Sequence, residues 1–488
     1  MAVLRKPRTW AAVGLLCIAA GVAAFGFSHG IVGGGPRPAP PPPERADGSI
    51  QLPADAVSDA GQRVVQPPVV DVGTTTPRHR RSNYLVITSD PQYPWTPEMD
   101  GHAVQCGEER ACSRALIQSQ YDSINRLVQT GHLVLGTFIN GDLTAFGHDW
   151  QIQYMKSAIG SIRTPVYLGL GNHDYENNVD DCWENSCVRS SVQWFRDHMS
   201  KLPLDAFDVR DSRYYNFPWN RRDVHGSLGW TKRFGDITVI QVNNYPEYEA
   251  YAQGLEIRRA GRAVTYIQEQ VFINDGMRWL DQQLRRERAA GQAIVVMSHI
   301  GWGSEAFTGL LNHYEVSALF AGHMHDWVGP EPRWNKGDVP IFFSGSSVRR
   351  SYLIAQRVEN DPELKLWVVE DNDESKRRLA ATIPLKRTGR HLDSGLNSWV
   401  TIKNGIGRGS DVRASLLYIA GGHLQSTEPE YVTEVKSFQL PANADTLLVR
   451  IERRDGAPTN PWRTIYHRLE PVRTFVCLRA GSTAVSKC

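Results

Sequence analysis

Five short apolar segments, separated by helical patterns, constrain the fold most strongly. They are "YLVIT" (84–88), "LVLGTFI" (133–139), "TPVYLGLG" (164–171), "AIVVMS" (293–298) and "VSALFAG" (316–322). Their continuous apolar and β-branched character predicts buried strands. Segments 113–131 and 277–291 have helical spacing, which predicts helices, and Gly131 is a candidate cap for the first of them. Strands that alternate with helices predict a layered α/β domain.

Each predicted strand is followed by side chains that can bind a metal ion. These side chains are Asp90, Gln92, Asp142, Asn172, His299, His323 and His325. An aspartate after a strand is usually a turn former, so each position alone is a weak signal. Strand ends at one edge of an α/β sheet converge on one crevice, so we expect the set to meet. Carboxylate, amide and imidazole together suit Mn, Fe or Zn, and seven ligands suit two ions that share a bridging carboxylate.

The same residues form an ordered set of motifs. In this chain they read Asp90-Pro-Gln92, Gly141-Asp142, Gly171-Asn172-His173-Asp174, His299 and Gly322-His323-Met324-His325. Over roughly residues 82–385 the set resembles the calcineurin-like metallophosphoesterase family. The resemblance implies an α/β fold of four layers, in which two stacked β-sheets are flanked by helices.

The resemblance also implies a role for each residue. The first metal would be held by Asp90, Gln92 and His325. The second would be held by Asn172, His299 and His323, and Asp142 would bridge the two. His173 would act as the general acid or stabilise charge on the phosphoryl group, with Asp174 as a candidate orienting partner. The implied reaction is attack on a phosphate ester by a hydroxide that bridges two divalent ions (Mn, Fe or Zn).

Two departures from the family pattern bear on the metals. The family usually has histidine where this chain has Gln92, and a neutral amide is the weaker ligand, so we expect a looser first metal. Purple acid phosphatases have a tyrosine where this chain has Ala145, which argues against an iron–tyrosinate centre. Because Pro91 restricts the residue before it, we expect an extended backbone at Asp90.

The N-terminus has the pattern of an export segment. Arg5, Lys6 and Arg8 precede an uncharged, mostly apolar run at 10–27. Residues 1–29 are therefore predicted to be a signal peptide or a membrane anchor, and the length of the run leaves both open. Either one places the rest of the chain outside the cytoplasm, as a periplasmic, secreted or outward-anchored protein.

A spacer and paired cysteines fit that location. Residues 30–81 are rich in proline and predict an extended or disordered linker. Beyond Cys17, the cysteines fall into three close pairs: Cys106 with Cys112, Cys182 with Cys187, and Cys477 with Cys488. Local disulfides are the simplest hypothesis in an oxidising compartment, and free thiols or a zinc site are the alternatives.

The catalytic domain is predicted to end near residue 388, and beyond it the pattern of alternating strands and helices stops. Short β-rich segments separated by Gly, Pro and Asn predict an antiparallel β-sandwich over 389–488. This region faintly resembles the C-terminal β-sandwich of thiol-activated cytolysins, which docks on membranes or receptors. The alternative is a sandwich with a purely structural role.

Two classes of function remain open at this stage. The first is an exported phosphoesterase acting on a phosphate ester, with membrane or cell-envelope contact through the N-terminal segment or the C-terminal domain. The second is a surface-binding or toxin-like protein with a degenerate metal site. The net charge of +2 and the lack of a long basic run give no indication of nucleic acid as a partner.

Substrate-binding residues are harder to predict. Tyr245, Tyr248 and Tyr251 could contact a nucleoside or a lipid, although packing is the commoner role of such a cluster. Arg349 and Arg350 could contact phosphate or lie free on the surface.

Overall fold

The computed structural model describes most of the chain beyond its N-terminal region. It covers residues 82–487 except 104–105, 359–360, 388–398, 406–409, 421–422, 434, 440–445, 456–462, 470–474 and 480–484. The predicted export segment and linker, at 1–81, lie outside the described residues, as does the predicted boundary near 388. Within the described part of the chain, no helix is both long and apolar enough to cross a membrane.

The first sheet contains three of the predicted strands. It has six strands in the order β17-β16-β15-β1-β2-β3, with parallel pairing along β1, β2 and β3. Their bounds are β1 Ser82–Thr88, β2 Leu133–Asn140, β3 Val166–Gly169, β15 Tyr352–Val358, β16 Glu363–Val369 and β17 Arg378–Pro384. The parallel pairing brings the ends of β1, β2 and β3 to one edge of the sheet.

The second sheet contains the other two predicted strands. Its seven strands run in the order β13-β14-β12-β11-β8-β7-β4, and β8, β11, β12 and β14 are parallel. Their bounds are β4 Ala206–Phe207, β7 Trp230–Phe234, β8 Ile237–Gln241, β11 Ala293–Ser298, β12 Ala318–Ala321, β13 Val328–Pro330 and β14 Ile341–Ser344. The strands that carry the predicted ligands therefore belong to two sheets rather than one.

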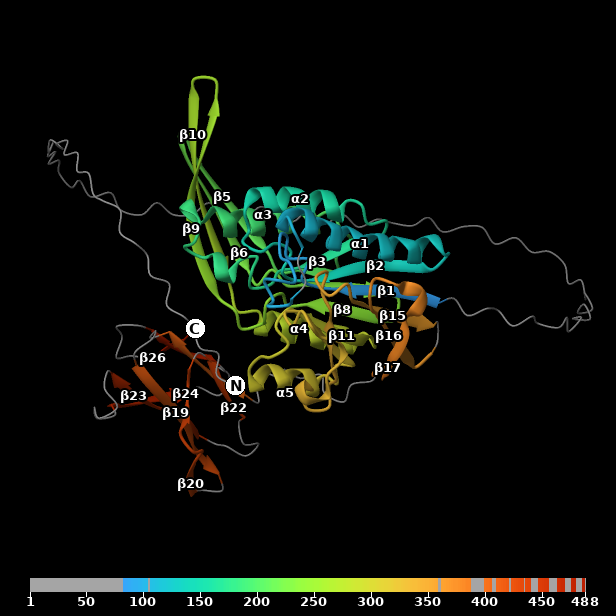
Figure 1. Cartoon of the computed structure of the whole chain (residues 1–488). Coiled ribbons are helices and arrows are strands. Elements are labelled where there is room, and N and C mark those ends of the chain that lie inside the picture. The colour runs from blue at the N-terminus through green and yellow to red at the C-terminus, as the bar shows by residue number, and fades with distance from the viewer. Residues whose placement is uncertain are drawn as a thin grey trace, which may run out of the picture. The chain divides into compact units, whose positions relative to one another are not determined.

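The two sheets are stacked face to face between layers of helices (Figure 1), and strand β11 contributes side chains to both of the cores that result. Val295 and Met297 join a core with strands of the first sheet and with helices α1 to α3. Ile294 and Val296 join the opposite core with α4 and α5. The helices are α1 Glu109–Gln129, α2 Asp149–Ile159, α3 Ser186–Met199, α4 Met277–Ala289 and α5 Glu305–His313. The result is the expected four-layer α/β fold of helices, sheet, sheet and helices.

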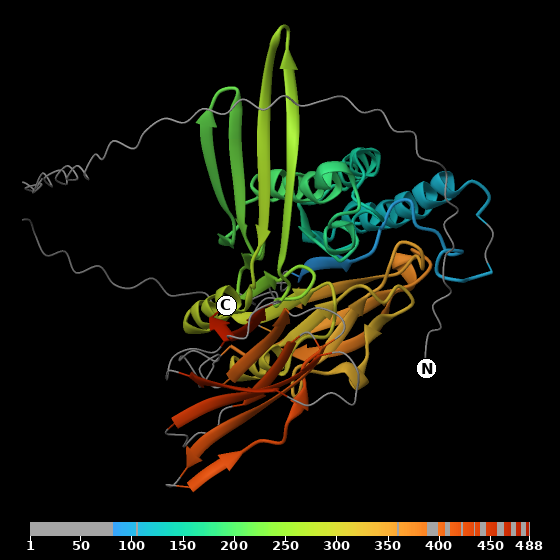
Figure 2. The same ribbon diagram turned by 90° about the vertical axis from the view of Figure 1, so that its left-hand side faces the viewer.

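A third sheet extends from this body. Its four strands have the order β5-β6-β10-β9, and they form two long hairpins (Figure 2). Their bounds are β5 Arg210–Asn216, β6 Trp219–Gly226, β9 Ala250–Ala260 and β10 Ala263–Ile273. The hairpins are linked by parallel pairing of β6 with β10.

The C-terminal region is a small β domain of two sheets. One has the order β22-β18-β25-β26, and the other β20-β19-β23-β24 with β21 beside β19. The bounds are β18 Trp399–Gly405, β19 Ser410–Ala420, β20 His423–Ser426, β21 Glu430–Tyr431, β22 Val435–Gln439, β23 Thr446–Asp455, β24 Arg463–Leu469, β25 Phe475–Arg479 and β26 Val485–Lys487. Val400 and Ile402 of one sheet share a core with Val412 and Leu416 of the other, as in the predicted sandwich. The predicted antiparallel sandwich is confirmed, and the one parallel pair among its described strands is β18 with β25.

Candidate metal centre

The turn after β1 carries Asp90 and Gln92, and both side chains are fully buried. Their backbones lie in the left-handed region, with φ of 52° for Asp90 and 40° for Gln92. The prediction of an extended Asp90 before Pro91 is therefore wrong. Two hydrogen bonds to the next turn hold this backbone: the Asp90 amide donates to the Gly141 carbonyl (3.2 Å), and the Gln92 amide donates to the Asp142 carbonyl (2.9 Å).

The turn after β2 carries Asp142, which is also left-handed, with φ of 49°. Glycines on both sides let the chain approach closely. A Cβ at Gly141 would lie 2.4 Å from Nδ1 of His299, and a Cβ at Gly171 would lie 2.2 Å from Oδ1 of Asp142. Each distance is below the contact limit between nonbonded atoms, so a side chain at either glycine would displace a predicted ligand.

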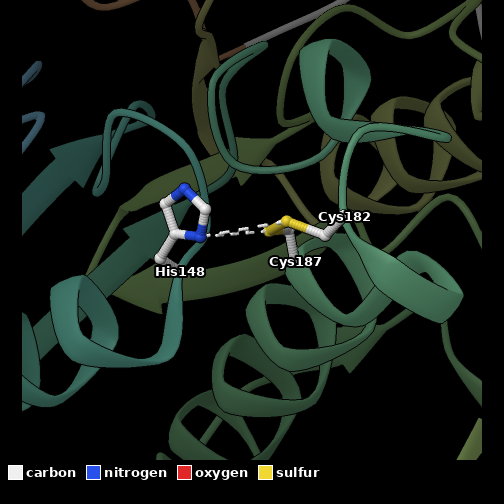
Figure 3. A group of neighbouring side chains, drawn as sticks. All are labelled: His148, Cys182 and Cys187. Atoms are coloured by element: carbon white, nitrogen blue, oxygen red, sulfur yellow. Dashed lines mark hydrogen bonds between the residues drawn. A yellow bond between two sulfur atoms is a disulfide. The ribbon is translucent and has the colours of Figure 1, made fainter. Parts of the chain in front are cut away.

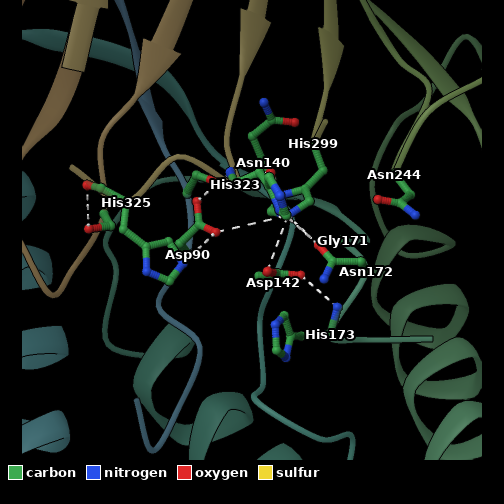
Figure 4. Close-up of polar contacts among 12 residues, drawn as sticks. Asp90, Asn140, Asp142, Gly171, Asn172, His173, Asn244, His299, His323 and His325 are labelled. Atoms are coloured by element: carbon green, nitrogen blue, oxygen red, sulfur yellow. Dashed lines mark hydrogen bonds and ion pairs between the residues drawn. The ribbon is translucent and has the colours of Figure 1, made fainter. Parts of the chain in front are cut away.

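His299, Asn172 and His323 meet beside Asp142 (Figure 4). Nε2 of His299 lies 3.1 Å from Oδ2 of Asp142 and 3.2 Å from Oδ1 of Asn172. The same Asn172 oxygen lies 3.0 Å from Nδ1 of His323. His299 donates its Nδ1–H to the Asn140 carbonyl (2.9 Å), which fixes the ring and directs Nε2 towards the other donors.

His325 and Asp90 form the neighbouring part of the centre. Nε2 of His325 lies 3.3 Å from Oδ1 of Asp90. On its other side, Nδ1 of His325 contacts both carboxylate oxygens of Asp100, each at 2.9 Å. Such carboxylate–histidine pairs orient metal ligands. Asp100 is not predictable from the sequence as part of the centre, because an aspartate before Gly101 has only the pattern of a turn.

The donor set fits two divalent ions. Asp142, His299 and His323 each offer a ligand atom within 4.8 Å of the others, and so do Asp90, Asp142 and His325. Asp142 belongs to both groups, as a bridging carboxylate would. At this centre, four buried side-chain atoms have no hydrogen-bond partner among the described residues: Oδ1 of Asp90, Oδ2 of Asp142, and Oε1 and Nε2 of Gln92. The two carboxylate oxygens face the imidazoles of His325 and His299, at 3.3 Å and 3.1 Å. Buried oxygens without partners are costly, and a cation would satisfy them.

The electrostatics of the centre favour positive charge. Burial opposes a charge on His299, but the carboxylates of Asp142 and Asp90 outweigh it and raise the pKa to about 9. Burial likewise opposes a charge on His325, but bonds to Asp100 and Asp90 raise its pKa to about 11. Burial and then the charge of His299 lower the pKa of His323 to about 4. A divalent ion would have to displace the protons of the first two rings.

His173 lies next to these donors but is outside both ligand groups. Its amide donates to Oδ1 of Asp142 (2.9 Å), and its ring Nδ1–H donates to the carbonyl of Ala145 (2.8 Å). The sequence suggested Asp174 as the orienting partner, but the Asp174 carboxylate instead accepts from the amides of Gly171, Leu143 and Thr144, each at 3.0 Å. Asp174 therefore links the two turns that carry the ligands. Burial is the larger cause, and the charge of Asp142 the smaller one, that raise the pKa of Asp174 to about 7.

Aromatic rings flank the centre. The ring of Trp95 lies 5.3 Å from that of His173, and the ring of Trp302 lies 5.2 Å from that of His323. Of the predicted tyrosines, Tyr248 is buried and packs edge-on against Tyr175 at 4.7 Å, in agreement with a packing role.

The two arginines considered for phosphate binding are engaged elsewhere. Arg349 contacts the carboxylate of Asp326 at 2.9 Å, and Arg350 pairs with Asp371. The positive charge of each guanidinium is therefore already paired with a carboxylate, and a phosphate group would have to compete with that carboxylate.

The cysteine pairs that can be assessed follow the local hypothesis. The structure contains disulfides Cys106–Cys112 and Cys182–Cys187. The pair Cys477–Cys488 lies outside the described side chains. Nδ1 of His148 lies 3.6 Å from Sγ of Cys187 and faces the second disulfide (Figure 3). Because sulfurs joined in a disulfide are not thiolates, these three residues do not form a zinc site in this state.

A family model for calcineurin-like phosphoesterases matches residues 85–327. This span contains every predicted ligand. Residues 85–327 belong to the calcineurin-like phosphoesterase family. The family implies hydrolysis of phosphoesters with divalent metals, typically two, and the acidic and histidine groups of the phosphoesterase domain are able to bind them.

No curated protein sequence matches the chain significantly. Among solved structures, a hypothetical protein from Pyrococcus horikoshii OT3 is 9% identical, with a TM-score of 0.25, and the match covers 59% of this chain and 87% of that one.

Two cytolysins are also found among solved structures. The match to listeriolysin O has 14% identity and a TM-score of 0.12, over 26% of this chain and 34% of the other. A non-haemolytic pneumolysin from Streptococcus pneumoniae has 12% identity and a TM-score of 0.12, over 26% and 44%.

Proposed function

We propose that the protein is an exported phosphoesterase that uses two divalent ions, drawn from Mn, Fe or Zn, to hydrolyse a phosphate ester. The observation that carries this proposal is the shared carboxylate: Asp142 belongs to both groups of donor atoms, one with His299 and His323 and one with Asp90 and His325. When bound, the two ions would neutralise phosphoryl charge and generate a hydroxide near neutral pH.

The side chains of the centre would position the metal ligands and move the proton. Asp142 would hold the two ligand groups together. Gly171 keeps space for Asp142, and Gly141 keeps space for His299. His173 would hold or release a proton at Nε2, because its Nδ1 is bonded to the Ala145 carbonyl. A proton held at that atom could pass to the leaving oxygen of the ester, which is the step that a general acid assists.

A panel of 4-nitrophenyl phosphate monoesters and diesters tests the proposal. The metal-free protein would be assayed with added Mn²⁺, Fe²⁺ or Zn²⁺. We expect turnover that depends on metal, and we expect Asp142→Asn to lose both ions and nearly all activity. Asp122→Asn is the matched control, because Asp122 is exposed on α1 and accepts a hydrogen bond from Gln118.

Two results would contradict the assignment. One is an Asp142→Asn variant that retains two ions and normal turnover. The other is a folded wild-type protein that turns over no ester in the presence of any of the three metals, which would favour the surface-binding alternative.

Export is the second part of the proposal. It is supported by the charged and apolar pattern of residues 1–29 and by disulfides Cys106–Cys112 and Cys182–Cys187. Mass spectrometry of the exported protein under non-reducing conditions should find both bridges and a third between Cys477 and Cys488. Free thiols at the last two positions would contradict the third pairing.

A further inference from the structure

The third sheet ends in two hairpin tips that project beyond the helices of the phosphoesterase domain (Figures 1 and 2). One tip joins β5 to β6, and the other joins β9 to β10. The register places Trp219, at the start of β6, opposite Tyr266 of β10 and Tyr266 opposite Ile257 of β9. The two tips are therefore neighbours on one side of the molecule.

The β5–β6 tip carries large aromatic side chains that are exposed. The exposed fractions are 57% for Tyr214, 77% for Tyr215, 72% for Phe217 and 56% for Trp219. We call these four residues the aromatic tip. Soluble proteins rarely expose large apolar side chains in one cluster unless the cluster has a binding role.

The β9–β10 tip is basic. Arg258, Arg259 and Arg262 are exposed there, and we call them the basic tip. Arg258 pairs with Glu256 of the same strand at 2.7 Å, and its side chain is 61% exposed. Residues 210–222 and 255–265 together contain seven arginines but only two acidic residues, whereas the whole chain has a net charge of +2. The hairpin ends therefore concentrate positive charge beside the exposed aromatic rings.

The two faces of this sheet differ. On one face, Glu269 pairs with Arg189 of α3 at 3.3 Å, and Asp211 pairs with Arg196 of α3 at 3.0 Å. On the other face, the rings of Trp219 and Tyr266 stack with centroids 4.2 Å apart. Helix α3 thus supports the sheet from one side, and on the other side stacking against Tyr266 holds Trp219 in place.

We propose that the aromatic tip and the basic tip dock together on an anionic lipid bilayer. Tryptophan and tyrosine favour the boundary between lipid and water, where an apolar ring and a polar group are both satisfied. Arginines beside them are attracted to anionic headgroups and can extend their charged ends to the phosphates. The tips protrude, so they can enter a bilayer surface without a matching pocket in a partner.

A fluorescent reporter at the tip tests this proposal in the full chain. An environment-sensitive fluorescent amino acid would be incorporated at position 216, where the exposed Asn216 lies between the aromatic side chains, and vesicles of phosphatidylcholine with or without phosphatidylglycerol would be added. We expect a blue shift with the anionic vesicles that high salt reduces. The same reporter at Lys376, whose side chain is 82% exposed, should not shift, which separates tip insertion from anchoring by residues 1–29.

Two sets of variants define the contributions. Tyr215→Ser with Phe217→Ser should abolish the shift at position 216. Arg258→Glu, Arg259→Glu and Arg262→Glu together should weaken binding to anionic vesicles by at least about tenfold. The control with the same change in charge combines reversals at three exposed sites away from the tips: Arg333→Glu, Lys376→Glu and Arg378→Glu.

The outcomes separate lipid from other partners. Turnover of a soluble nitrophenyl ester should be unchanged in the tip variants, which would show that they are folded. No shift with anionic vesicles, or an equal loss of binding in the control, would overturn the proposal. So would a blue shift that needs no vesicles and grows with protein concentration, because the tips would then dock on a second copy of the chain.

Discussion

Replacing Asp100 should weaken the metal site without removing a ligand. Its carboxylate contacts Nδ1 of His325 with both oxygens at 2.9 Å and accepts from the indole of Trp95 at 2.8 Å. In Asp100→Ala the His325 ring loses the partner that sets its orientation and tautomer. In Asp100→Asn the charge is lost, but an amide oxygen can still accept from Nδ1–H.

The magnitude follows from the lost contact. A hydrogen bond to a charged group contributes about 1.5–3 kcal/mol. Since about 1.4 kcal/mol corresponds to a tenfold change in an equilibrium constant, Asp100→Ala should weaken one metal by about 10- to 100-fold. This agrees with the loss of about 10- to 100-fold typical of residues that orient ligands. If Asp100 acts mainly by orienting the His325 ring, Asp100→Asn should lose much less metal affinity than Asp100→Ala.

Calorimetric titration of the metal-free protein with Mn²⁺ measures both dissociation constants. Asp122→Ala, on the exposed face of α1, is the control, and circular dichroism would verify that each variant is folded. If Asp100→Ala keeps both dissociation constants of the wild type, Asp100 does not orient a ligand and the reasoning is refuted. If Asp100→Asn loses as much as Asp100→Ala, the charge matters rather than the orientation.

Three further changes give separate tests. His173→Ala should keep both ions but lower kcat by about 10²- to 10⁴-fold; loss of metal on elemental analysis would instead make His173 a ligand. Gln92→His should tighten the more weakly bound metal and so lower the larger of the two dissociation constants, because imidazole is the better donor to Mn, Fe or Zn. If that constant does not change, Gln92 is a structural residue and not a ligand. Glu287 is fully buried, and its carboxylate accepts from Arg233 (2.6 Å), Arg286 (2.7 Å) and Thr238 (2.9 Å), which lowers its pKa against the effect of burial. Glu287→Gln should therefore destabilise the protein by about 1–3 kcal/mol at pH 7. Because the folded pKa is the lower one, that difference should shrink as the pH falls below the unfolded value of about 4.3, and equal denaturant midpoint differences at pH 7 and pH 3.5 would contradict this.

The elements of the phosphoesterase domain could be predicted because their signals are local. A run such as "AIVVMS" is apolar on both faces, and β11 is indeed buried on both faces, between two cores. The predicted ligands were found because each directly follows a strand and the motifs occur in a fixed order. Their roles at the metals stay predictions, although the structure brings Asp90, Asp142 and the three histidines together.

The features that the sequence could not predict depend on contacts distant in the chain. Asp100 reaches His325 across 225 positions, and nothing near Asp100 indicates that partner. The left-handed backbone of Asp90 is set by a hydrogen bond to the carbonyl of Gly141, which overrides the local effect of Pro91. The predicted role of Asp174 fails for a related reason: its carboxylate accepts hydrogen bonds from backbone amides of two separate turns, and not from His173.

The left-handed backbone at Asp90, Gln92, Asp142 and His323 has a consequence for directed evolution. Each such residue costs the folded state on the order of 1–3 kcal/mol, and glycine adopts this conformation without that penalty. A library selected only for heat resistance should therefore enrich glycine at these sites and accumulate inactive survivors. If each variant is screened for bound metal as well as for melting temperature, the selected variants should gain stability without losing the metal site.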